Sequence, residues 1–146
     1  MDIFYNKTDI IKNKILNYYK ENPLIIDEII LPIINGEDAI SLRFIEYFVT
    51  KYAKEKNIIF HILDEDNTTI KKINIYDSYK NYLHSYDKKL FDPFKRTNHL
   101  LFQYKEDAFI HTSIGQLNFF YWLITSGIYQ YISENYNNFE NVQITN

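Results

Sequence analysis

Apolar side chains in the N-terminal part of the chain recur at the spacing of amphipathic helices. Residues 8–20 carry them every three or four positions, which predicts a helix with its first residue, a threonine, as N-cap. A second helix, capped by Asp38 or Ser41, is predicted to run to about Lys56. The apolar segment 24–34 between them has no clear period and contains a proline, so a short buried strand and an irregular packing segment both fit it.

Two pairs of short apolar segments have the spacing of β-hairpins. Residues 58–63 and 68–75 flank the acidic turn 64–67, and the second of these segments comes close to alternation. Residues 99–104 and 108–112 flank a turn of three charged residues in the same way. The pattern therefore predicts two hairpins, one in the middle of the chain and one in its second half.

Helical spacing returns between and after the two hairpins. Residues 76–86 suit a short helix, and a loop is expected over 87–98. Ser113 and Gln116 have the spacing of a capping box, in which each side chain pairs with a backbone N–H at the start of a helix. We expect Gly127 to break or bend the helix that begins there.

These elements predict an α+β fold, with a small antiparallel sheet of two hairpins packed against about four helices. The chain of 146 residues has the length of one domain and shows no repeat or linker. We expect a single globular α+β domain over residues 1–136, followed by a polar C-terminal tail over 137–146.

Composition narrows the class of protein without naming a function. The sequence has 14 Tyr and 11 Phe, enough for a large aromatic core, and no Cys, which fits a reducing compartment. No apolar run approaches the length of a membrane span, so no membrane contact is predicted. The net charge is −3, but residues 71–105 hold eight Lys or Arg and three Asp, an excess of +5.

The chain carries no recognisable catalytic or metal-binding pattern. No two of the four histidines are three or four residues apart, and no Cys is available as a metal ligand. Ser113 lacks the flanking glycines of a nucleophile elbow, and the three glycines are too scattered for a phosphate loop. We therefore expect no enzyme activity, no metal and no cofactor. The histidines are His61, His84, His99 and His111.

The acidic cluster at 64–66 allows two interpretations. Neighbouring carboxylates can bind Mg²⁺ or transfer protons. Asp and Asn are also favoured in turns, where their side chains accept hydrogen bonds from nearby backbone. Because the cluster lies at a predicted hairpin turn, the structural interpretation is favoured.

A segment that interleaves cations with aromatic rings is the candidate site. Lysine and arginine neutralise phosphates, and exposed rings can stack on unpaired bases. The alternative is that the rings belong to the core and the lysines form a solvated face between them. The candidate nucleic-acid-binding residues are Tyr79, Lys80, Lys88, Lys89, Phe91, Phe94, Lys95 and Arg96.

Three stretches carry a family resemblance. They read SLRFIEYFVTKY at 41–52, FDPFKR at 91–96 and TSIGQLNFFYW at 112–122. The sequence resembles a family of short, largely uncharacterised proteins encoded by giant (nucleocytoplasmic large) DNA viruses of amoebae and algae, over roughly residues 40–136. The resemblance implies a virus-encoded protein that acts in the host cytoplasm, at the viral factory, or in the virion. It implies no known activity.

The chain departs from that family in the FDPF loop and before the tryptophan. The family typically continues the loop with Cys and two Arg, whereas Lys95 replaces the Cys here and Thr97 stands in place of the second Arg. Tyr121 occupies a position where the family commonly has a basic residue. This chain is therefore less basic than the family at these positions.

Two function classes are favoured by these observations, and an enzyme whose carboxylate–histidine site is assembled only in three dimensions is the third alternative. The first is a non-catalytic binding domain that contacts DNA or RNA through the basic and aromatic face. The second is a protein-interaction or virion-structural domain, as a homo-oligomer or with a viral or host protein as partner, because the abundant rings can form exposed patches.

Overall fold

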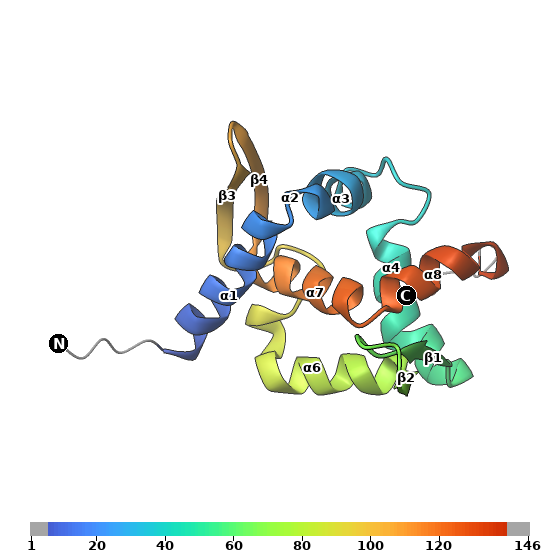
Figure 1. Ribbon diagram of the computed structural model, residues 1–146. Helices are drawn as coiled ribbons and strands as arrows, with labels where there is room; N and C mark the ends of the chain where they lie inside the picture. Colours follow the sequence, from blue (N-terminus) through green and yellow to red (C-terminus); the bar gives the residue numbers. More distant parts are fainter. Residues whose placement is uncertain (1–5, 140–146) are drawn as a thin grey trace.

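The computed structural model describes residues 6–139, and its elements surround one central helix, α7 (Ile114–Thr125). Side chains all around α7 are buried, as expected for a helix that is apolar on every side. The helices α1 (Lys7–Glu21), α6 (Ile75–Leu90) and α8 (Ile128–Asn135) each pack against it (Figure 1). The core of the protein therefore lies along α7.

The first predicted helix forms, but a different residue caps it. The side chain of Asn6, not that of Thr8, accepts a hydrogen bond from the Asp9 N–H at 2.8 Å. The buried Tyr19 hydroxyl donates to the carbonyl of Leu117 at 2.8 Å. This hydrogen bond ties α1 to the central helix.

The apolar segment after α1 is helical, so the strand considered for it is wrong. It consists of α2 (Pro23–Ile25), the π-helix η1 (Ile26–Ile30) and α3 (Leu31–Ile34). Ile26, Ile30 and Ile33 are buried at helical spacing, but isoleucine and leucine also fill the half-buried positions between them. Because apolar residues occupy both kinds of position, the sequence lacks the contrast that reveals a period.

The second predicted helix is confirmed to its last residue and contains a π-helical turn. It runs through α4 (Leu42–Tyr47), η2 (Phe48–Tyr52) and α5 (Ala53–Lys56). Of the two cap candidates, Ser41 is the one that caps, since its hydroxyl accepts from the Phe44 N–H at 3.0 Å. Residue 57 then adopts a left-handed conformation, which ends the helix.

Both hairpins form, and the α+β class is confirmed. β1 (Ile59–Leu63) pairs with β2 (Ile70–Asn74), and β3 (His99–Lys105) pairs with β4 (Ala108–Ser113), both antiparallel. Within residues 6–139 the hairpins remain two separate two-stranded sheets and do not join into the single small sheet expected. Figure 1 shows them at different ends of the molecule, with the turn end of β3–β4 extending beyond α1 and α2.

The remaining boundaries differ from the predictions by a few residues. α6 kinks at Asp87 (φ +54°) and resumes to residue 90, so the loop begins later than expected. Gly127 separates α7 from α8 with φ +84°, as predicted. A 3₁₀ turn, η3 (Tyr136–Asn138), follows, and Phe139 is buried with its ring 4.9 Å from that of Phe48. Packed structure therefore continues three residues beyond the boundary predicted at 136, and the rest of the expected tail lies outside the described residues.

None of the helices described is long and apolar enough to span a membrane.

Candidate functional site

The loop 91–96 is held against the first turn of α7. The Asp92 N–H donates to the carbonyl of Gly115 at 3.2 Å, and the Gln116 side-chain amide donates to the carbonyl of Pro93 at 2.9 Å. Residues 91–93 are buried, where an unpaired backbone group would be costly. These bonds therefore allow the first half of the loop to lie inside the protein.

The side chain of Gln116, which was expected to cap the helix, holds the loop. Its backbone N–H does donate to the Ser113 hydroxyl at 3.0 Å, which confirms the predicted cap. Its side chain turns to the loop instead, so the second half of the predicted capping box is wrong. The Thr112 hydroxyl donates to the Gln116 Oε1 at 2.8 Å, which directs the amide NH₂ toward Pro93.

Close backbone contact explains the glycine at the start of α7. A Cβ atom on Gly115 would lie 3.1 Å from the carbonyl oxygen of Lys89 and 3.4 Å from the nitrogen of Asp92. Three residues later in the same helix, Asn118 donates through its buried amide to the carbonyl of Leu90 at 2.7 Å. The FDPF and GQLNFF stretches are therefore the two sides of one contact.

Two of the three predicted aromatic site residues lie in the core. Phe91 is 0% exposed and Tyr79 is 7% exposed. Their ring centroids lie 5.4 Å and 5.9 Å from that of Trp122, which is also fully buried. Neither ring can stack on a base, so we correct the candidate interface by removing both. Phe94 remains, half-buried at the surface.

All five predicted cations are exposed, but one of them is paired. The Arg96 guanidinium lies 3.3 Å from Asp92 and 3.7 Å from Glu46, and its Cζ is 5.0 Å from the ring centroid of Phe94. Arg96 therefore contributes to holding the loop. The exposed cations are Lys80, Lys88, Lys89, Lys95 and Arg96.

Asp92 is turned into the loop. One of its carboxylate oxygens accepts the Phe94 N–H at 3.1 Å, and the other accepts from Arg96. The side chain is 7% exposed. The carboxylate therefore contributes little negative surface, and the outward face of the loop keeps its cations.

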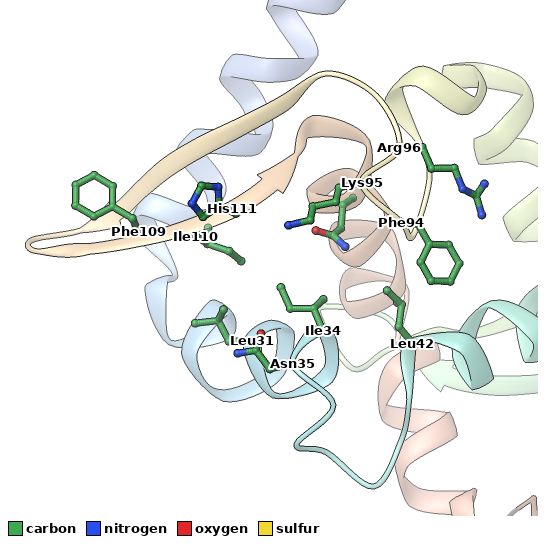
Figure 2. Close-up of a pocket in the computed structure, with 11 residues that line it drawn as sticks. Leu31, Ile34, Asn35, Leu42, Phe94, Lys95, Arg96, Phe109, Ile110 and His111 are labelled. Carbon is green, nitrogen blue, oxygen red and sulfur yellow. The ribbon is translucent and has the colours of Figure 1, made fainter.

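A groove of about 610 Å³ lies beside the loop (Figure 2). Lys95 is directed into it from the loop, between strand β4 and helix α3. One wall comes from α3 and α4, and the other comes from β4. The wall residues are Leu31, Ile34, Leu42, Phe109, Ile110 and His111.

A contact between β3 and η1 connects the two sides of the groove. The Tyr104 hydroxyl donates to Asp27 at 2.5 Å, and Lys105 forms an ion pair with the same carboxylate. The hydrogen bonds from Lys105 and then Tyr104 lower the pKa of Asp27. Burial, together with the bond to Asp27, raises the pKa of Tyr104 to about 12. The β3–β4 hairpin is therefore joined to the helical segment that carries the opposite wall.

The acidic cluster 64–66 has the structural role that the sequence predicts, in which its carboxylates accept hydrogen bonds from backbone N–H groups of the turn. The Thr68 N–H lies 3.1 Å from an Asp66 carboxylate oxygen, and the Thr69 N–H lies 3.3 Å from Asp64. These bonds close the β1–β2 turn. Across residues 6–139, the structure brings no three His, Asp or Glu side chains into a group that could hold a metal ion.

Comparison with known proteins places the chain. A family model described as "Family of unknown function (DUF7197)" matches residues 4–144. The chain belongs to this family. A relative of this DUF7197 chain, "Uncharacterized protein L507" of Acanthamoeba polyphaga mimivirus, is 38% identical over 107 residues. The expected resemblance to uncharacterised proteins of giant DNA viruses is confirmed by this relative. That the FDPF and GQLNFF stretches are motifs of the family stays a prediction.

The match covers unequal shares of the two proteins. It includes 70% of this DUF7197 chain but only 40% of the mimivirus protein, so the chain spans less than half the length of that relative. No solved structure matches this chain.

Sequence reasoning about this DUF7197 chain missed the groove. Its walls come from residues 31–34, 42 and 109–111, which lie far apart in the sequence. One signal was present: the alternation in β4 places Phe109 and His111 on the face opposite the core. Nothing in the sequence indicates that α3 lies beside that strand.

Proposed function

We propose that this chain is a non-catalytic, virus-encoded binding domain that contacts the phosphates of nucleic acid. One observation carries the proposal. Lys88 and Lys89 precede the buried segment of the loop, and both are exposed next to a segment whose carboxylate, Asp92, faces inward. Exposed lysines that neutralise phosphates release counterions, and this release supports binding to DNA or RNA.

The burial of two predicted aromatic rings limits how the protein can contact nucleic acid. With Tyr79 and Phe91 in the core, phosphate contact rather than base stacking supplies the affinity. Binding should therefore depend steeply on salt and little on base sequence. We further propose that the protein acts in the cytoplasm of the infected cell or in the virion, a proposal supported by its giant-virus relative.

Fluorescence anisotropy tests the proposal. The chain is titrated against labelled single-stranded and duplex DNA and RNA at about 50 mM and about 200 mM salt, the range in which phosphate contacts lose affinity. We expect binding that weakens as salt rises. The double variant Lys88→Ala with Lys89→Ala should weaken it further, whereas Lys12→Ala with Lys20→Ala, which removes two exposed lysines of α1, should not. Absent or salt-independent binding would refute the proposal.

A second candidate function is protein interaction. The groove favours it, because six of its eleven lining residues carry large apolar side chains. A binding site for phosphates needs few such residues, whereas a peptide site uses them for affinity.

A further inference from the structure

The groove runs along the free edge of strand β4. Residues 109, 110 and 111 all line it, although successive side chains of a strand point to opposite faces of the sheet. A groove that touches both kinds of side chain must run beside the strand and not over one face. Of the strands described within residues 6–139, only β3 pairs with β4, so the edge that faces the groove has no partner strand.

The chemistry of the groove complements a segment that is both apolar and acidic. Leu31 and Ile34 of α3 stand opposite β4, so apolar side chains that enter the groove meet an apolar wall (Figure 2). Lys95 points into the same space, and Arg96 also lines it. The lining includes no Asp or Glu. Because Arg96 is already paired with Asp92 and Glu46, Lys95 is the cation that a carboxylate inside the groove would meet.

We propose that an extended, acidic segment of a partner protein binds in this groove and adds to β4 as a third strand. Its main-chain N–H and C=O groups pair with the free edge of the strand, the mode known as β-augmentation. Its inward side chains are apolar and contact Leu31 and Ile34, and at least one carboxylate pairs with Lys95. This inference does not depend on nucleic-acid binding, which is assigned to other lysines.

Strand addition accounts for this combination better than other occupants do. A docked helix satisfies its own backbone and has no use for the edge of β4. A nucleic-acid backbone gains nothing from the apolar wall of Leu31 and Ile34. An exposed edge is normally covered or blocked in native proteins, and this one is held open beside a charged loop.

Selection from a phage-displayed library of random peptides of about eight residues tests the proposal, because strands are about this long or shorter. The full chain is the bait, and the variant Ile34→Glu is used for counter-selection. We expect enriched sequences that alternate apolar residues with Asp or Glu. No enrichment, or enrichment of basic or proline-rich peptides, would overturn the proposal.

Backbone methylation then distinguishes strand addition from other modes. The best peptide is synthesised in two forms, each N-methylated at alternate residues, so that one form loses the N–H groups that face β4 and the other does not. We expect one form to lose about tenfold or more in affinity and the other to lose little, because N–H groups alternate in direction along a strand. Equal losses in both forms would contradict the proposed mode.

Matched variants locate the peptide in the groove. Lys95→Glu changes an exposed side chain and should weaken the acidic peptide about tenfold or more without threatening the fold. Leu24→Glu, at a leucine that is 60% exposed outside the groove, should have no effect. Hydrogen exchange should slow, when the peptide binds, at those amides within residues 109–111 that face the free edge of β4. Unchanged affinity in Lys95→Glu would place the peptide elsewhere and overturn the proposal.

The closing measurement separates this proposal from nucleic-acid binding. Lys88→Ala with Lys89→Ala should leave peptide affinity unchanged while it weakens oligonucleotide binding. Displacement of the labelled peptide by a single-stranded oligonucleotide at about 50 mM salt would assign the groove to nucleic acid and refute the peptide proposal. Peptide binding that persists in a chain without oligonucleotide affinity would support it.

Discussion

The first and second halves of the loop 91–96 meet opposite environments. Phe91, Asp92 and Pro93 are buried against α7, and their backbone is bonded to that helix. Phe94, Lys95 and Arg96 face outward, and all three line the groove. Adjacent residues of one short segment therefore have separate roles: the inner half, 91–93, fixes the loop, and the outer half, 94–96, presents its charge.

The substitution expected to lower the stability of the fold most lies in the inner half of the loop. Phe91→Ala removes a fully buried ring that contacts Trp122, so it should lower the free energy of unfolding by about 3–5 kcal/mol. Urea denaturation monitored by circular dichroism measures the change. Phe109→Ala is the matched control, because that ring is 53% exposed and its loss should cost about 0.5 kcal/mol or less. Similar losses at both positions would show that the burial of Phe91 does not give the inner half its stabilising role.

The second-largest loss of stability is expected at Gln116, whose side chain holds the inner half of the loop. Gln116→Leu keeps much of the side-chain volume but leaves the carbonyl of Pro93 and the hydroxyl of Thr112 without this partner. Because both groups are buried, we expect a loss of about 1–3 kcal/mol in the free energy of unfolding. Gln103→Leu, at an exposed position of β3, controls for the substitution itself. A neutral Gln116→Leu would mean that the amide does not hold the loop.

Local patterns predicted most of the elements. Alternation with a turn found both hairpins, and helical spacing with a capping serine found the helices that begin after Ser41 and Ser113. These signals depend on residues a few positions apart, so they survive in the sequence alone. They failed at 24–34, where apolar residues fill the half-buried positions as well as the buried ones.

The candidate site was only partly predictable, because long-range contacts decide which residues are exposed. Phe91 and Phe94 have the same side chain three residues apart, but contacts from α7 bury the first and leave the second at the surface. Interleaved rings and lysines cannot reveal that difference. The exposure of Lys88 and Lys89 could be expected, since long charged side chains are rarely buried.

Arg96 tests the boundary between the two halves. Arg96→Ala removes the cation beside the buried Asp92 carboxylate, but the Phe94 N–H still donates to that group. Since the Arg96 side chain is 53% exposed, solvent screens the pair, and we expect a loss of about 1 kcal/mol or less in unfolding free energy. Thermal unfolding with Arg96→Lys as the control measures it. A loss as large as that of Phe91→Ala would place Arg96 in the inner half.

The smallest effect on stability is expected at Lys95. Lys95→Ala should change the free energy of unfolding by about 0.5 kcal/mol or less, because the side chain is exposed. The same variant should weaken the acidic peptide selected for the groove. Urea denaturation and peptide titration of one preparation measure both quantities. Loss of stability without loss of binding would reverse the roles assigned to the two halves.

The central position of α7 also affects how the protein is made. Ribosomes build a chain from its N-terminus, and α7 begins only at Ile114, after the helices and hairpins that precede it in sequence. Until α7 emerges, Tyr19, Phe91 and the other side chains that pack on it have no core to enter. The nascent chain therefore carries these side chains unburied until α7 has been synthesised, and chaperones can bind them during that interval.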